Sequence, residues 1–137
     1  MFLDTNVAAS ALASRGRCAA VLDLVLERHR LLASDEVEAE LTRALTRKFR
    51  LPGPLAVEVS AGYCRTAERV SSLPAREIPH PDPADRAVLS AAWNGEADVL
   101  VTGDTGVRAL RRVGRVLIMT PREFWEATRP EAVGEGR

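Results

Sequence analysis

The chain has 137 residues, a formal net charge of zero, and 46% hydrophobic and 28% charged residues. This length suits one ordinary domain with a substantial core, and the composition excludes a disordered chain. Zero net charge argues against a strongly basic, non-specific nucleic-acid binder, although an acidic site can offset a basic substrate surface. No apolar run is long enough to cross a membrane, and the N-terminal MFLDTNV does not resemble a signal peptide, so we expect a cytoplasmic protein.

Short apolar runs alternate with helical patterns along the chain. The elements expected in the first half are a strand at Phe2–Asp4, a helix at Cys18–His29, a strand at Arg30–Ser34, a helix from Asp35 to about Phe49, and a helix that begins at Pro52-Gly53-Pro54 and runs through Val70. Those expected in the second half are a loop at Pro74–Pro83 with a short extended piece near Glu77–Ile78, a helix at Pro83–Asn94, a strand at Asp98–Thr102, a helix at Thr105–Val113, a strand at Arg115–Met119 and a helix at Pro121–Thr128.

This alternation predicts an α/β protein with a parallel sheet and helices on both of its faces. The continuous apolar runs VLV and VLI fit strands that are buried on both sides. We expect residues 1–128 to form one domain and residues 129–137 to be a polar C-terminal tail.

The cysteines and histidines do not suggest a soft-metal site. Cys18 and Cys64 lie on predicted helix faces, and we expect reduced thiols, with a redox pair as the weaker alternative. His29 and His80 are distant in sequence from each other and from the cysteines, so we predict that both are surface residues. No Walker loop, GxGxxG motif or nucleophilic triad is present.

Two acidic residues follow predicted parallel strands. Asp4 comes directly after the first strand, and Asp104 follows the strand at Asp98–Thr102. In an open parallel sheet, ligands bind beyond the carboxyl ends of the strands. Either residue could instead cap the helix that follows it. Asp98 stands at the start of that strand, so we place it at the opposite end of the sheet.

Two more acids lie on inward-facing sides of predicted helices. Glu40 shares a helix face with Val37 and Leu41, so its charge needs a partner, which is either an arginine or a metal ion. Asp85 lies along the buried side of the helix at Pro83–Asn94, whereas Asp82 fits the N-cap of that helix. Together with the two strand-end acids, these side chains would repel one another unless a divalent cation neutralised them. Oxygen ligands favour Mg²⁺ or Mn²⁺.

Four motifs resemble the PIN domain, and within it the VapC-like toxins of toxin–antitoxin systems. They are LDTNV at residues 3–7, EVEAELTRAL around Glu40, DPADRAVLSAA around Asp82 and Asp85, and VTGD at residues 101–104. The resemblance runs from Leu3 to about Glu126. It implies a three-layer α/β/α sandwich with a central, mostly parallel sheet, and an endoribonuclease that uses Mg²⁺ or Mn²⁺.

The resemblance also implies roles for individual residues. The catalytic and metal-binding acids match Asp4, Glu40, Asp85 and Asp104, and the supporting positions match Asn6, Thr102 and Asp82. A protein antitoxin and a homodimer are further implied partners. Apolar positions at Val57 and Tyr63, which we expect to be exposed, would suit such a dimer.

The reaction implied is hydrolysis of RNA phosphodiesters by a metal-activated water. Arginines could hold RNA phosphates, although a solvated surface charge is the favoured interpretation of any single one; the candidates are Arg15, Arg17, Arg43, Arg47 and Arg108. One alternative is a catalytically silent PIN-like module that binds an antitoxin or RNA. Another is a phosphatase or DNA nuclease, but Asp4-Thr5-Asn6 lacks the second aspartate of a phosphatase DxD motif.

Overall fold

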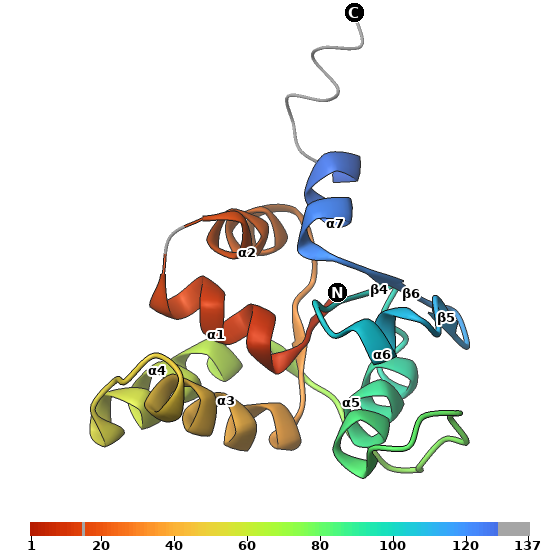
Figure 1. Cartoon of the computed structure of the whole chain (residues 1–137), viewed down its shortest axis with the longest axis horizontal. Coiled ribbons are helices and arrows are strands. Elements are labelled where there is room, and N and C mark those ends of the chain that lie inside the picture. Colours follow the sequence, from red (N-terminus) through yellow and green to blue (C-terminus); the bar gives the residue numbers. More distant parts are fainter. Residues whose placement is uncertain (15, 129–137) are drawn as a thin grey trace, which may run out of the picture.

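The computed structural model describes residues 1–14 and 16–128, and in this part of the chain seven helices alternate with six strands (Figure 1). In chain order they are β1 Phe2–Leu3, α1 Thr5–Ala13, α2 Arg17–Arg28, β2 Leu32–Ala33, α3 Asp35–Arg47, α4 Gly53–Arg65, β3 Glu68–Arg69, α5 Pro83–Asn94, β4 Val99–Val101, α6 Thr105–Arg108, β5 Arg112–Val113, β6 Val116–Met119 and α7 Pro121–Thr128. Arg15 and the expected tail at residues 129–137 lie outside the described residues.

The strands form one sheet in the order β3-β2-β1-β4-β6-β5. Neighbouring strands are parallel except β5 and β6, which form an antiparallel hairpin. β1 pairs with β2 on one side and β4 on the other, and both of its residues are fully buried. The predicted α/β class with a mostly parallel sheet is confirmed.

Side chains alternate between two hydrophobic clusters, one on each face of the sheet. Phe2 and Leu100 join the cluster that contains the buried side of α5. Leu3 and Val101, the next residues of the same strands, join the cluster built from α1, α2 and part of α4. Figure 1 shows α1 and α2 on one side and α5 and α6 on the other, as in a three-layer sandwich.

Helix α3 contributes to both clusters. Val37, in its first turn, packs with the α5 cluster, whereas Leu41 and Leu45 pack with the α1 cluster. Ser34 caps this helix through a bond from the Val37 amide to the Ser34 hydroxyl (3.4 Å). Because α3 starts directly after β2, its first turns lie at the carboxyl edge of the sheet, next to the end of β1.

Two helix predictions were wrong at their C-terminal ends. The helix predicted to run through Val70 ends at Arg65, because Glu68–Arg69 pairs with β2 as the edge strand β3. The helix predicted at Thr105–Val113 ends at Arg108. The chain then turns through Arg111 and Gly114, whose φ angles are 62° and 57°, and pairs β5 with β6. No strand forms near Glu77–Ile78, within the described residues. The edge strands β3 and β5 have two residues each, which is too short for an alternation of apolar and polar side chains to be recognised in the sequence.

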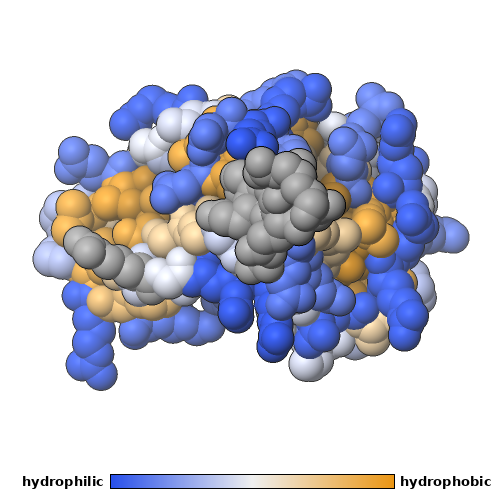
Figure 2. Space-filling model, turned by 90° about the horizontal axis from the view of Figure 1, so that it is seen from above, coloured by the Kyte–Doolittle hydropathy of each residue, from blue (hydrophilic) through white to orange (hydrophobic). Residues whose placement is uncertain are grey.

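Most large apolar side chains are covered. Figure 2 shows the face seen from above as mostly hydrophilic, with smaller hydrophobic areas between the charged side chains. Exposed large apolar residues include Val57 (58%) and its neighbour Leu55 (45%) on α4. Tyr63 is only 5% exposed, so the prediction that it forms an exposed apolar surface with Val57 was wrong. None of the helices within residues 1–14 and 16–128 has the length and apolar character needed to span a membrane.

We expect Leu100→Ala to lower the free energy of unfolding by about 2–5 kcal/mol, because Leu100 is 1% exposed in a central strand and truncation leaves a cavity. Leu73→Ala is the matched control, since Leu73 is 71% exposed and should change stability by no more than about 0.5 kcal/mol. Urea denaturation of both variants measures the difference. Equal losses would contradict the central position assigned to β4.

Candidate metal centre

The carboxyl ends of β1 and β4 bring Asp4 and Asp104 to the same edge of the sheet. The backbone amide of Asp4 donates to the Val101 carbonyl (2.9 Å), which places the two strand ends side by side. The Thr102 hydroxyl donates to Asp4 Oδ2 (2.6 Å) and accepts from the Asp104 amide (3.0 Å). Thr102 is fully buried, so one hydroxyl connects both strand ends.

Both of these acids also cap helices. Asp4 Oδ1 accepts from the Thr5 amide (2.8 Å) at the start of α1, and Asp104 Oδ1 accepts from the Val107 amide (3.0 Å) at the start of α6. Capping and site formation were alternatives in the sequence, but the geometry accommodates both. Each cap holds a carboxylate at the sheet edge, where it can also face a ligand.

Glu40 joins this edge from the second turn of α3. Its Oε2 accepts from the hydroxyl of Thr5 (3.3 Å), a buried residue at the start of α1. Among the ion pairs of the described residues, none involves Glu40. The arginine partner that the sequence left open is therefore not found there.

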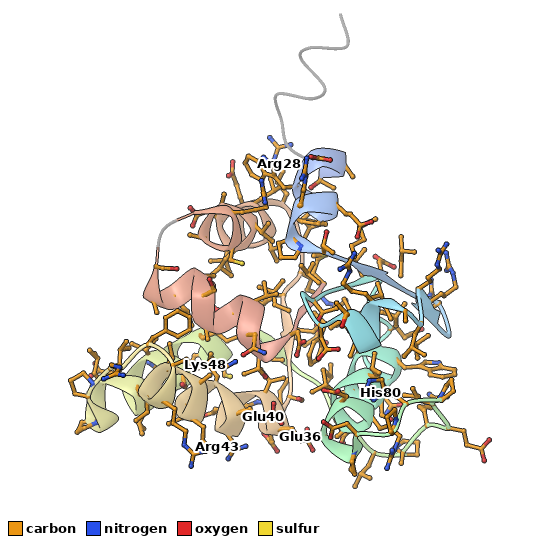
Figure 3. All side chains as sticks on the ribbon, in the orientation of Figure 1. Arg28, Glu36, Glu40, Arg43, Lys48 and His80 are labelled. Carbon is orange, nitrogen blue, oxygen red and sulfur yellow. The ribbon has the colours of Figure 1, made fainter. Side chains whose placement is uncertain are left out.

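The other acids of α3 have different partners. Glu36 accepts from the Ser72 hydroxyl (2.8 Å), and Glu38 pairs with Arg69 (2.9 Å). Both contacts join α3 to the segment around β3. Of the acids on α3, Glu40 is therefore the one that lies at the sheet edge with Asp4. Figure 3 shows it on α3 beside the end of β1.

Asp85 lies in the first turn of α5, and Asp82 is the N-cap of that helix through a bond from the Ala84 amide (2.9 Å). Asp82 is exposed and Asp85 is half-buried. This matches the distinction between the two made from the sequence: Asp82 serves the helix, and Asp85 faces the interior.

His80 approaches Asp85, and its predicted surface position was wrong. Its side chain is 9% exposed, and Nε2 lies 3.5 Å from Asp85 Oδ2. The loop before α5 folds back because the Arg86 guanidinium donates to the carbonyls of His80 (2.7 Å) and Pro81 (2.9 Å). His29 is exposed, as predicted, and Cys18 and Cys64 are both unpaired thiols.

The four predicted acids line one open pocket of about 300 Å³. The other lining residues are Thr5, Asn6, Arg43, Ala44, Arg47 and Lys48. Lys48, the only lysine in the chain, donates to Asn6 Oδ1 (2.9 Å) at the rim. Figure 3 labels Arg43 on the same helix as Glu40, Lys48 at the C-cap of that helix, and His80 beside α5. A cavity of about 260 Å³ at Met1 and Asp98 contains none of the four acids, so we assign the candidate metal centre to the acidic pocket.

Burial and repulsion between carboxylates raise the pKa of two acids of this pocket, Asp4 and Asp85. Burial raises the pKa of Asp4, and the charge of Asp104 adds to the rise, whereas hydrogen bonds from Thr102 and Thr5 oppose it. Burial is also the largest cause of the raised pKa of Asp85, followed by repulsion from Asp82. These carboxylates are therefore destabilised as anions unless a cation is present.

The donor set fits a hard divalent cation. Ligand atoms of Asp85, Asp104 and His80 lie within 4.8 Å of one another, and Asp4 is coupled electrostatically to both aspartates. Carboxylate oxygens in an open, water-accessible pocket are the ligands and setting that Mg²⁺ and Mn²⁺ prefer. The residues that could hold such an ion are Asp4, Glu40, Asp85 and Asp104.

Three side chains at this site were not predicted as site residues. Thr5 holds Glu40, His80 contacts Asp85, and Lys48 contacts Asn6. Thr5 lies inside the LDTNV motif, which was a signal for it. His80 lies two residues before the DPAD sequence, but nothing in the sequence shows that its loop folds inward.

In the metal-free protein, we expect the free energy of unfolding of Asp4→Asn to increase relative to that of wild type as the pH rises. The pKa of Asp4 is raised above its ordinary value of 3.8, so the folded state holds this proton more tightly than the unfolded chain does. The contribution of Asp4 to the free energy of unfolding of wild type therefore falls as the pH rises from about 3.8 through the raised pKa. The variant has no carboxyl group at this position and lacks this loss. Denaturation in EDTA from below pH 3.8 to neutral pH measures it.

Asp23→Asn is the control for this series, because Asp23 is exposed on α2. Its unfolding curves show the effect of removing one carboxylate outside the pocket. Any change in hydrogen bonding caused by Asp4→Asn adds a constant offset and does not alter the slope. A parallel pair of curves for wild type and Asp4→Asn would contradict the raised pKa.

Comparison with known proteins identifies the family. A model of the PIN domain matches residues 1–106, which include every motif from LDTNV to VTGD. The search of curated proteins gave no match. A chain in the crystal structure of VapBC2 from Rickettsia felis, bound to a DNA fragment from their promoter, is 16% identical, with a TM-score of 0.61 over 85% of this chain and 95% of that one. That likeness concerns the fold, and the match over residues 1–106 shows that the chain belongs to the PIN domain family.

Proposed function

We propose that this protein is a metal-dependent endoribonuclease that hydrolyses RNA phosphodiesters, with Asp4, Glu40, Asp85 and Asp104 as its metal-binding carboxylates. The observation that carries the proposal is that four segments, distant in sequence, bring these acids into one open pocket. Packing does not require this arrangement, since it raises the pKa of Asp4 and Asp85 by burying like charges together. Membership of the PIN domain family supports a nuclease.

Each part of the pocket has a separate task in this proposal. When bound, Mg²⁺ or Mn²⁺ would supply activation of the attacking water and neutralisation of charge at the scissile phosphate. Thr102 holds Asp4 and the Asp104 backbone, and Thr5 holds Glu40, so the carboxylates are oriented before a ligand arrives. Asp82 contributes by capping the helix that carries Asp85.

A positively charged rim suits the RNA backbone. Arg43 and Arg47 on α3 and Lys48 at its C-cap are exposed and line the same pocket as the acids. Arg17 and Arg108 are exposed and line another pocket, near the end of β6. We assign phosphate contacts to the α3 group first, because these three cations share a pocket with the carboxylates.

The biological role we propose is that of the toxin in a toxin–antitoxin pair acting in the cytoplasm. The fold likeness to a chain of the VapBC2 structure and the motif resemblance to VapC-like toxins support this role. A protein antitoxin is then the expected partner. A homodimer is also proposed, and the exposed Leu55 and Val57 on α4 are apolar residues that such an interface could cover.

Purified wild type should cleave a mixed RNA pool with Mg²⁺ or Mn²⁺ and not with EDTA. Asp4→Asn and Asp85→Asn should each reduce the cleavage rate by about 100-fold or more, because each removes a charged ligand at the reacting phosphate. Asp98→Asn is the matched control: Asp98 is an exposed acid at the opposite sheet edge, and its variant should keep full activity.

A parallel assay with single-stranded DNA distinguishes the two nucleic acids. Cleavage of DNA and not of RNA would contradict the proposed ribonuclease and show a DNA nuclease. Folded wild type that binds Mn²⁺ and RNA but cleaves neither nucleic acid would support the catalytically silent binding module. Cleavage that persists in both aspartate variants would contradict the assigned centre.

Lys48→Ala should weaken RNA binding across sequences and reduce its salt dependence. Each phosphate contact to a single strand contributes about 0.7 to the slope of log K against log salt concentration, so the loss of one contact should lower the slope by about that amount. Binding of labelled RNA by Asp4→Asn, with and without Lys48→Ala, can be measured without cleavage. Arg28→Ala, which removes an exposed cation of α2 away from the pocket, should leave the slope unchanged (Figure 3).

A further inference from the structure

Three of the four acids of the pocket accept a hydrogen bond from elsewhere in the protein. Asp4 accepts from the Thr102 hydroxyl, Glu40 from the Thr5 hydroxyl, and Asp104 from the Val107 amide. Asp85 is different, because no hydrogen bond to its side chain is found among the described residues, and His80 Nε2 lies 3.5 Å from its Oδ2. The role of His80 toward Asp85 therefore decides how the fourth carboxylate is held.

The protonation of the His80 ring follows from its other nitrogen. The Asp82 amide donates to His80 Nδ1 (3.2 Å), so Nδ1 is an acceptor and carries no proton. The ring proton must then be on Nε2, the atom that faces Asp85 Oδ2. A protonated Nε2 has no lone pair for a metal ion. His80 consequently cannot serve as a ligand through Nε2 while this bond from Asp82 exists.

The surroundings of His80 restrict the ring to this place. Its backbone amide donates to the Ile78 carbonyl (2.8 Å), and its carbonyl accepts from the Arg86 guanidinium (2.7 Å). Pro79 and Pro81 flank it in the sequence and limit the backbone angles of the loop. A Cβ at Gly106 would lie 3.3 Å from His80 Nε2 and 3.2 Å from Asp104 Oδ1, so the glycine leaves room for both side chains.

We propose that His80 is a positioning residue for the metal-binding carboxylate Asp85, and not a metal ligand itself. This inference rests on the proposed function, because it assumes that Asp85 binds the cation. Nε2 lies 3.5 Å from Asp85 Oδ2, and no hydrogen bond to Oδ1 is found among the described residues, so Oδ1 would be the oxygen offered to a ligand. At 3.5 Å the contact is at the outer limit of a hydrogen bond, so it acts mainly as an electrostatic contact between the N–H group and the carboxylate.

This arrangement gives the loop before α5 a function at the site. Asp82 caps the helix with its carboxylate and orients His80 with its backbone amide, and His80 orients Asp85. The positive end of the N–H dipole also offsets the repulsion that Asp85 receives from Asp82, Asp104 and Asp4. Partners of this kind, which bond to a ligand and not to the metal, change metal affinity by about 10–100-fold when they are removed.

The ring proton can be located in the metal-free chain of 137 residues. The chain has two histidines, so a long-range ¹H–¹⁵N correlation spectrum of wild type contains two rings, and His29→Gln identifies the His80 signals. We expect the proton of His80 on Nε2 at neutral pH. A proton on Nδ1, or rapid exchange between both tautomers, would overturn the assignment without affecting the proposed nuclease.

Metal binding provides the second test. His80→Ala should weaken Mn²⁺ binding in calorimetry by about 10–100-fold, whereas His80→Gln, whose amide can still donate to Asp85, should restore most of the affinity. His29→Ala should bind Mn²⁺ as wild type does. Pulsed electron paramagnetic resonance of Mn²⁺-loaded wild type should show no directly coordinated nitrogen, and a nitrogen coupling that disappears in His80→Gln would make His80 a ligand and overturn the proposal.

The two proposals can fail separately. If wild type binds no Mn²⁺, both the metal centre and the positioning role of His80 are wrong, even if the His80 tautomer is as expected. Mn²⁺ binding that is equal in wild type, His80→Ala and His80→Gln would leave the metal centre intact and remove only the role of His80. Unfolding curves of the metal-free variants show whether any loss of binding comes from a loss of the fold.

Discussion

The hydroxyl of Thr102 joins the ends of β1 and β4, and the site is built around that junction. It donates to Asp4 and accepts from the Asp104 amide, so two acids that are far apart in the sequence are held by one buried group. The junction exists because β1 and β4 are adjacent and parallel, with Leu3 opposite Val101. Helices α1 and α6 begin directly after these strands, and the same carboxylates cap them.

A like-charged pocket is costly for the fold, and its surroundings show how that cost is limited. Burial raises the pKa of Asp4 and Asp85, which means that their charged forms are poorly solvated. Backbone amides, two threonine hydroxyls and the Nε2 proton of His80 compensate in part, while Lys48 lies at the rim. These donors lower the cost of the buried charges and also orient the acids. They therefore hold the carboxylates in the arrangement that the proposed cation would need.

Sequence patterns predicted the class of the fold, since the central strands are continuous apolar runs and the long helices have clear polar and apolar sides. They predicted poorly where pairing partners decide the structure. Glu68–Arg69 is too short and too polar to be identified as a strand, and it is one because β2 has a free edge beside it. The end of α6 likewise depends on the pairing of β5 with β6, which no local pattern reveals.

The sequence by itself determined the acids and their motifs: Asp4 and Asp104 follow apolar strands, and Glu40 and Asp85 lie on inward helix faces, because strand ends and helix periodicity are local properties. Only the tertiary structure decided their partners. Thr5 reaches Glu40 across 35 positions and Thr102 reaches Asp4 across 98, and His80 turns inward because its loop is tied to Arg86. Contacts between segments so far apart depend on which strands and helices are packed together, and a local pattern carries no information about that.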